Sequence, residues 1–165
     1  AQIKAMKSVA GRLRLDLAQY RELEAFASFS SDLDASSRAT LERGQRLVEL
    51  LKQGQYQPYP VEREVVSIWL GTTGKLDKVP VPEVRRFESE FLDYVARNHG
   101  GVFDGIRQSK ALGDDAVQGL ERAVEEFYGQ FQTSEGGTLR IKEDEAEAMD
   151  ASERGQERVQ VKRSA

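Results

Sequence analysis

The 165-residue sequence contains no cysteine and one histidine, His99. The absence of cysteine excludes disulfide frameworks and thiolate metal sites. His99 stands just before two glycines, where a helix is expected to end, and the negative end of a helix favours a cation or a hydrogen-bond donor. A role in proton transfer would need an orienting partner, which the sequence does not identify. We therefore expect a structural role for His99 and no metal site.

Long hydrophobic runs are also missing, and so is an N-terminal stretch that is first basic and then apolar. A membrane-spanning helix needs about 18 or more apolar residues, so we expect no direct insertion into a membrane. The chain has 24 Lys and Arg against 28 Asp and Glu, which gives a net charge of −4. A general nucleic-acid binder normally has a basic excess, so this balance argues against nucleic acid as a partner.

The common catalytic motifs do not occur. The sequence has no GxxxxGK[ST] phosphate loop, no HExxH zinc-binding pair and no GxSxG nucleophile turn. We therefore expect no catalytic residue in this chain.

Helical periodicity is the strongest signal that the sequence does contain. Near the N-terminus, apolar residues recur at steps of three and four over about six turns. The stripe consists of Ile3, Met6, Ala10, Leu13, Leu17, Tyr20 and Leu23. Burying each large member is worth about 1.5–3 kcal/mol, so the stripe should direct this helix against other helices. Gly11 lies inside it and predicts a bend or a close neighbour.

The same reasoning predicts an all-α fold, a bundle of about six helices. We expect helices over residues 2–28, 35–52, 60–70, 82–98 and 102–109, and a last helix that is capped by Asp114 or Asp115 and reaches Phe131. The predicted inward face of the second helix is Leu41, Gly44, Leu47, Val48 and Leu51. For the third helix it is Val61, Val65, Ile68 and Trp69.

The composition changes after residue 133. From Ser134 onward there are no aromatic residues, eight acidic residues and six basic residues. Such a segment lacks the apolar surface needed to fill a core. We therefore predict a helical domain over residues 1–133 and a charged, mostly disordered tail over residues 134–165. Within the tail, Thr138 to Lys142 could form a short edge strand or nothing.

A polar elbow separates the first two predicted helices. Serines break the helical pattern there, and Asp32 and Asp34 offer carboxylates that can cap the next helix. The two carboxylates could in principle do acid/base chemistry, but capping and solvation explain them more simply.

The run QIKAMKSVAGRLRLDLAQYRELEAFASFSSDLD, continued by RGQRLVELLKQGQY, closely resembles the C-terminal helical domain of the alpha subunit of bacterial F-type ATP synthases. The resemblance is dense from Ala1 to about Tyr59 and looser to about Phe131. Because the sequence starts with Ala1 inside a helical pattern, we expect it to be a piece of a longer protein. One departure is Gly74-Lys75-Leu76-Asp77, where the family often has an aromatic residue in place of Lys75.

The resemblance implies a place for the elbow. In that family, alpha and beta subunits alternate in a hexameric ring around a gamma shaft, and the elbow between the first two helices faces the shaft. Phe29, Ser31, Asp32 and Asp34 are therefore candidate gamma contacts. An ordinary helix cap explains the same residues, and one residue could serve both purposes.

The resemblance also implies a nucleotide contact at the loop Gln53-Gly54-Gln55. The family uses glutamines of this loop to hold the adenine of the ATP, as Mg-ATP, that is bound at the non-catalytic alpha site. Gln53 and Gln55 stand at the matching positions, and an amide offers both the donor and the acceptor that adenine requires. Without the family, a Gln-Gly-Gln turn would be interpreted as a helix stop.

The resemblance also implies which parts of the enzyme lie outside this sequence. The parts that grip the phosphates, and the arginine that reaches the beta catalytic site, belong to a domain upstream of Ala1, so Arg12, Arg14 and Arg21 are not assigned that role. The chain would act in ATP synthesis coupled to proton transport only within the complex, with beta and gamma subunits as partners. It would lie peripherally on the cytoplasmic face of the bacterial inner membrane. Tails longer than usual have been linked in some bacterial members to restraint of ATP hydrolysis, and this could apply to residues 135–165.

Two other interpretations remain open. The protein could be a free-standing helical adaptor that binds a partner helix in a groove. It could also be the equivalent domain of a related hexameric motor, such as a flagellar or secretion ATPase. The words DLAQYRELEAF and QGQY favour the ATP synthase alpha subunit over both.

Overall fold

A computed structural model describes residues 2–29, 32–52 and 58–139 of the protein. Within these residues the regular structure is helical, so the predicted all-α fold is confirmed. The helices are α1 (Lys4–Ala27), α2 (Ala35–Leu50), α3 (Val61–Thr72), the 3-10 turn η1 (Val81–Glu83), α4 (Val84–Asn98), α5 (Gly100–Ser109) and α6 (Asp114–Tyr128). The chain forms two compact units, Ala1–Val124 and Glu125–Ala165, which are described separately.

The predicted helices occur in the right order, with small shifts at their ends. Pro60 is the cap of α3 and not its first residue, and α3 continues through Gly71 to Thr72. Pro82 lies in η1, so α4 begins two residues later than predicted, at Val84. The predicted end at residue 70 lies just before Gly71, since glycine weakens helices, but Gly71 lies against Leu47 and Leu50 of α2 and remains inside the helix.

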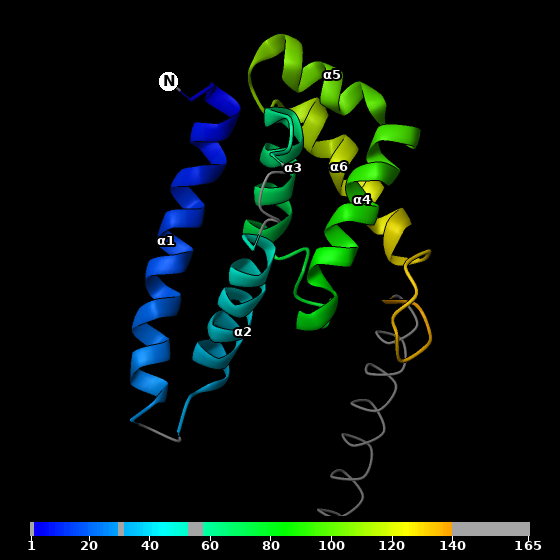
Figure 1. Ribbon diagram of the computed structural model, residues 1–165. Helices are drawn as coiled ribbons and strands as arrows, with labels where there is room; N and C mark the ends of the chain where they lie inside the picture. Colours follow the sequence, from blue (N-terminus) through cyan, green and yellow to red (C-terminus); the bar gives the residue numbers. More distant parts are fainter. Residues whose placement is uncertain (1, 30–31, 53–57, 140–165) are drawn as a thin grey trace, which may run out of the picture. The chain divides into compact units, whose positions relative to one another are not determined.

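Helix α3 is the central element of the first unit. It contacts α1, α2, α4 and α5, and Figure 1 shows α1 and α2 side by side with their axes antiparallel. Because neighbours surround α3, more of it is buried than the single predicted face: Val66 and Leu70 are fully buried together with Val65. The prediction for Val61 is wrong. This residue is 37% exposed, since it is the first residue of the helix.

The packing of α2 depends on two glycines. A methyl group on Gly44 would overlap the ring of Tyr20 in α1, and one on Gly71 would lie 2.6 Å from Leu47 and 2.8 Å from Leu50. These contacts rotate α2 so that its buried residues are Gly44, Leu47 and Leu50. The predicted inward residues Val48 and Leu51 are instead 36% and 41% exposed. At the C-terminal end of α2, the predicted inward face is therefore rotated by a fraction of a turn from the observed one.

For Gly11 of α1 the sequence predicted a bend or a close neighbour, and the structure speaks to the second alternative. A methyl group placed on it would meet nothing within 4 Å, other than the helix's own backbone and adjacent residues. The expectation of a close neighbour is thus wrong within the described part of the protein.

A tight turn joins α3 to η1. Gly74 has φ of 78°, a left-handed conformation that suits glycine, and the Asp77 amide donates to the Gly74 carbonyl oxygen at 3.2 Å. Two arginines of α2 hold this turn. Arg43 Nε donates to Asp77 Oδ1 at 3.1 Å, and Arg46 Nε donates to the Val79 carbonyl oxygen at 2.8 Å. The turn therefore persists although its aromatic residue is replaced by Lys75.

The second unit continues beyond α6 with an ordered turn. The rings of Phe127 and Phe131 lie 5.8 Å apart, and the Thr133 amide donates to the Gly137 carbonyl oxygen at 3.1 Å. Thr138 forms an isolated antiparallel bridge with Gln132, and Leu139 is only 2% exposed. Leu139 is therefore a buried apolar residue beyond the predicted boundary at residue 133, in the segment for which the sequence left a short strand open. The described part of the predicted edge segment contains this single bridge, and residues 140–142 lie outside the described residues.

Candidate functional site

The elbow that connects α1 to α2 carries the predicted gamma contacts. Helix α1 ends when the Ser28 hydroxyl donates to the Ala25 carbonyl oxygen at 2.6 Å and the Phe29 amide donates to the Phe26 carbonyl oxygen at 3.0 Å. Phe29 is 91% exposed and Phe26 is 55% exposed. Two aromatic rings thus stand in solvent at one end of the helical hairpin, where another polypeptide can reach them.

Asp34 caps the first turn of α2, as the sequence predicted. Its Oδ1 accepts a hydrogen bond from the Ser37 amide at 2.9 Å, and its Oδ2 accepts one from the Ser36 hydroxyl at 3.4 Å. Hydrogen bonds from Ser37, first from its side chain and then from its backbone, lower the pKa of Asp34 below its ordinary value. The carboxylate therefore remains charged at neutral pH at the exposed N-terminus of α2.

The structure brings Phe29, Asp32 and Asp34 together on one elbow, and all three are exposed. Asp34 is engaged as a cap, so a contact with another polypeptide would have to share its oxygens with Ser36 and Ser37. Ser31, Gln53 and Gln55 lie outside the described residues. The gamma-contact and adenine assignments therefore stay predictions.

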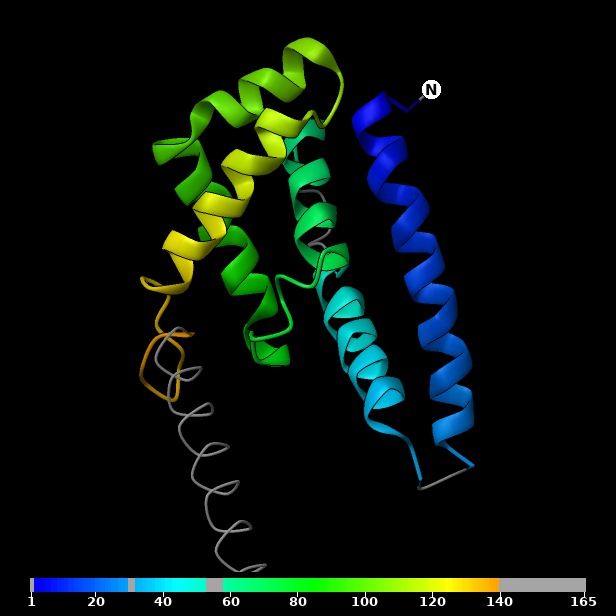
Figure 2. The same ribbon diagram turned by 180° about the vertical axis from the view of Figure 1, so that it is seen from behind.

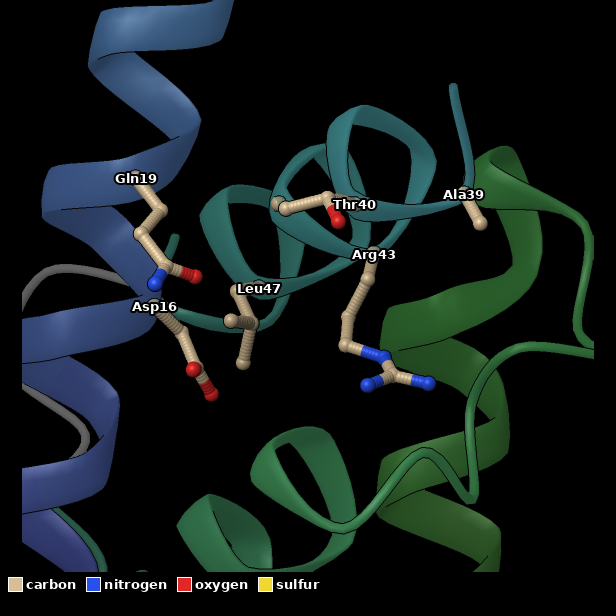
Figure 3. A pocket seen from close by; sticks show the side chains of 7 residues that line it. Asp16, Gln19, Ala39, Thr40, Arg43 and Leu47 are labelled. Atoms are coloured by element: carbon tan, nitrogen blue, oxygen red, sulfur yellow. The ribbon is translucent and has the colours of Figure 1, made fainter. Parts of the chain in front are cut away.

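A small pocket lies between α1 and α2 (Figure 3). Its volume is about 120 Å³, and its lining is Asp16 and Gln19 from α1 and Ala39, Thr40, Arg43, Gly44 and Leu47 from α2. The Arg43 side chain is held by the bidentate pair with Asp77, and the Asp16 charge adds to that of Asp77 in raising the pKa of Arg43. No sequence pattern indicated this pocket, because Asp16 and Arg43 belong to different helices.

One buried charge lies between α3 and α4. Glu88 is 4% exposed, and its carboxylate accepts a hydrogen bond from the Ser67 hydroxyl. Burial raises the pKa of Glu88, while the Ser67 hydrogen bond and the Arg85 charge oppose this shift. Sequence reasoning missed Glu88; its only sign in the sequence is its position next to Phe87 and between the apolar residues Val84 and Phe91.

His99 joins two helices. It follows the last residue of α4 and also precedes α5, and its ring lies 5.8 Å from that of Tyr94. The described residues contain no group of three or more His, Cys, Asp or Glu side chains placed to hold a metal ion. None of the described helices combines the length and the apolar character that a membrane span requires.

Comparison with known proteins gives a consistent result. The family described as "ATP synthase alpha/beta chain, C terminal domain" matches residues 2–127. The sequence is 62% identical to "ATP synthase subunit alpha" of Frankia alni over 99% of its own length and 30% of that protein. It is 61% identical to the protein of the same name in Thermobifida fusca, over 98% of its own length and 29% of that relative.

A third relative extends the comparison to the end of the sequence. "ATP synthase subunit alpha" of Mycolicibacterium vanbaalenii is 58% identical over 100% of this sequence, so the match includes residues 134–165. The protein spans about 30% of the length of these relatives.

Proposed function

Because the protein belongs to the family of C-terminal domains of ATP synthase alpha and beta subunits, we propose that it is the helical C-terminal domain of the alpha subunit of a bacterial F-type ATP synthase. The observation that carries the proposal is an identity of 58–62% to bacterial alpha subunits over almost the whole sequence. In this role the domain contributes to proton-coupled ATP synthesis only within the complex, since its own sequence has no catalytic motif.

The proposed work of the domain is mechanical. It packs against beta subunits in the alternating alpha/beta ring, and its elbow presents Phe29, Ser31, Asp32 and Asp34 to the gamma subunit. The exposed Phe29 ring and the elbow carboxylates suit this contact, because apolar area and charge can both be matched by a shaft with Arg or Lys side chains. The complex would lie on the cytoplasmic face of the bacterial inner membrane as a peripheral assembly.

A second proposed role is to cover the adenine of Mg-ATP at the non-catalytic site. Gln53 and Gln55 would supply the amide groups, and a domain upstream of Ala1 would bind the phosphates. The loop joins two firmly packed helices, because Leu50 at the end of α2 and Val65 in α3 are both buried.

The adenine role is tested by replacing Gln53 and Gln55 together with Ala in the full alpha subunit. We expect faster loss of nucleotide from the non-catalytic site, because the adenine loses two amide partners, with thermal unfolding unchanged. A suitable control is the double change Gln108→Ala and Gln118→Ala, which removes two exposed amides from α5 and α6. Equal nucleotide retention by the loop variant and the control would refute the adenine role.

Reconstitution tests the proposal as a whole. The full subunit should assemble with the beta and gamma subunits of an F-type enzyme into a head that hydrolyses ATP. Assembly with the subunits of a flagellar or secretion motor instead, or no assembly with either, would favour the related motor or the adaptor.

A further inference from the structure

The starts of α1 and α3 meet the end of α5 at one place. The Ala5 amide of α1 donates to the Lys110 carbonyl oxygen at 2.9 Å. Arg107 of α5 binds Glu62 Oε1 of α3 through Nε at 3.0 Å and Nη2 at 2.9 Å. Figures 1 and 2 both show the N-terminal end of α1 beside the turn that joins α5 to α6. These contacts are called here the junction, and its residues are Ala5, Glu62, Arg107 and Lys110.

Lys110 has a backbone conformation that lysine rarely adopts. Its φ of 58° and ψ of 17° are left-handed, and among the residues that the structure describes it is the only non-glycine residue with a positive φ. This conformation crowds the Cβ atom of any residue but glycine, and it persists only where the surrounding contacts hold it. Such a strained residue is a reason to look for a role in function.

The Ala5 amide depends on the carbonyl oxygen of Lys110. Ala5 lies in the first turn of α1, where amides have no acceptor within the helix, and the cap residue Ile3 offers no side-chain hydrogen bond. Ala5 is 0% exposed, so water does not replace the acceptor. If Lys110 left its left-handed conformation, its carbonyl oxygen would turn away and leave a buried amide without a partner, which is costly.

The charged half of the junction holds the start of α3. Glu62 is only 8% exposed although it lies in the first turn of that helix. A hydrogen bond from its own backbone amide lowers the pKa of Glu62 most, burial opposes this shift, and the charges of Arg107 and Lys110 lower the pKa further. The end of α5 therefore holds α1 through a backbone hydrogen bond and α3 through charge.

The two helix starts have different neighbours along the chain. In the proposed function, the residues just before α3 include Gln53 and Gln55, which contact adenine. The residues before α1 lead to the upstream domain that binds the phosphates. Adenine and phosphates belong to the same nucleotide, so affinity is highest when both sets of contacts are held in place before the nucleotide binds.

We propose that the junction positions the start of α3 relative to the domain upstream of Ala1 and thereby sets how firmly the non-catalytic site retains its nucleotide. Glu62, Arg107 and Lys110 are positioning residues, which act through the two helix starts. The proposal rests on the proposed function, because the nucleotide site belongs to it.

Two substitutions of Lys110 form a matched pair in the full alpha subunit, assembled with beta and gamma subunits. Both remove the same charge, but valine is branched at Cβ and disfavours the left-handed conformation, whereas glycine favours it. Lys110→Val should speed the release of Mg-ATP from the non-catalytic site by about 5-fold, and Lys110→Gly should change it by less than about 2-fold. The control Arg97→Val removes an exposed cation from the last turn of α4 and should leave the rate unchanged.

The ion pair provides a second test, which remains if the valine variant fails to fold. Arg107→Gln should speed the release of Mg-ATP by about 3-fold, and Arg107→Lys, which keeps the charge, should restore most of the retention. The control is Asp93→Asn. It breaks the pair of Asp93 Oδ1 with Arg63 Nη2 at 3.1 Å, which joins α3 to α4 and not to α5, and should leave the rate unchanged.

A combined variant shows whether the junction acts through the adenine contacts. When Gln53 and Gln55 are both replaced by Ala, the adenine has already lost these partners, so adding Lys110→Val should change the release rate little. Hydrogen exchange of the Ala5 amide reports the opening of the junction itself. It should be faster in Lys110→Val than in Lys110→Gly.

Several results would overturn the proposal. One is faster exchange of the Ala5 amide and a lower unfolding temperature in Lys110→Val with unchanged release of Mg-ATP, which would make the junction purely structural. Others are equal release rates in Lys110→Val and Lys110→Gly, or an unchanged rate in Arg107→Gln. If the Gln53 and Gln55 variant releases nucleotide faster while the junction variants do not, only this proposal fails. If that variant also retains nucleotide normally, the proposed adenine role fails and this proposal fails with it.

Discussion

Gly44 shows how one residue can fix the distance between two helices. Its lack of a side chain lets the Tyr20 ring of α1 lie directly on the backbone of α2. By contrast, a methyl group added to Gly11 of α1 would meet open space. Substitution by alanine should therefore change the free energy of unfolding in opposite directions at the two positions.

Gly44→Ala should lower the free energy of unfolding by about 1–3 kcal/mol, because the added methyl group forces Tyr20 and the helices to move. Gly11→Ala should raise it by about 0.5–1 kcal/mol, because alanine is the better helix former and nothing obstructs it. Urea unfolding followed by circular dichroism measures both. Destabilisation by both substitutions would mean that Gly11 has a neighbour as well.

Glu88 is the residue whose charge is least compatible with its surroundings. Its pKa is raised above the ordinary 4.5 by burial, so the folded protein holds the proton more tightly than the unfolded protein does. The folded state is therefore penalised as the pH rises through the raised pKa, and the penalty disappears below 4.5.

Glu88→Gln should accordingly raise the free energy of unfolding at pH 7, since the amide oxygen can still accept from Ser67 and carries no charge. Near pH 4 the variant and the parent protein should be equally stable. Urea unfolding between pH 4 and pH 8 measures the difference. Glu90→Gln, on the exposed face of α4, is the control and should show no such trend. A gain that is independent of pH would indicate better packing and not removal of a charge.

At the scale of the elements, the beginning of α2 is decided by one carboxylate. Asp34 satisfies the Ser37 amide, which has no partner within the helix, and its negative charge lies at the positive end of the helix dipole. Asparagine can provide the same hydrogen bond without the charge, so the cap and the charge can be separated experimentally.

Asp34→Ala should fray the first turn of α2, seen as faster hydrogen exchange of the Ser37 amide, whereas Asp34→Asn should retain most of the protection. The pKa of Asp34 is lowered in the folded protein, so its stabilisation is present above the unfolded value of 3.8 and is lost as the pH falls through the lower folded value. Only the parent protein should show this acid dependence. If Asp34→Asn instead weakens a gamma contact without fraying α2, the carboxylate has both roles.

Ion pairs between helices add a second layer of organisation. Lys75 pairs with Glu121 of α6, Arg107 Nη2 of α5 lies 2.9 Å from Glu62 Oε1 of α3, and Arg43 pairs with Asp77. Each joins elements that are far apart in the sequence. In each pair at least one side chain is 40% or more exposed. Ion pairs that solvent reaches contribute about 0–1 kcal/mol each, so they orient the elements while the apolar core provides most of the stability.

At the scale of the whole molecule, a buried residue lies beyond residue 133, where the composition predicts a tail. Leu139 is buried although it lies in a segment with many charges and no aromatic residue. The turn before it depends on Gly136 and Gly137, whose φ values of 85° and 82° are left-handed. Composition averages over such a segment and hides one anchoring residue.

Leu139→Ala should destabilise the second unit by about 2–5 kcal/mol, the usual cost of removing a buried leucine. Hydrogen exchange of amides between residues 125 and 139 measures the effect locally. Gln130→Ala, an exposed position in the same unit, should change little. If Leu139→Ala has no effect, the folded domain ends at residue 133, as the composition predicts.

The sequence by itself determined that the protein is a set of helices, their order, the Asp34 cap and the family. These properties depend on local hydrogen bonds and on periodicities of three and four residues, which a short window of sequence contains. The elbow was found for the same reason, since its serines and aspartates mark a break and a new start within a few residues.

Only the tertiary structure decided which side of each helix became the interior. Val48 and Leu51 fit the helical period but are exposed. The rotation of α2 is set by two close contacts, that of Gly44 with Tyr20 of α1 and that of Gly71 of α3 with Leu47 and Leu50. The pairs Ser67–Glu88 and Lys75–Glu121 join residues 21 and 46 positions apart, and no local pattern encodes such distances. Helix packing brings these groups together, and the same packing leaves Leu15 and Phe26 of α1 exposed.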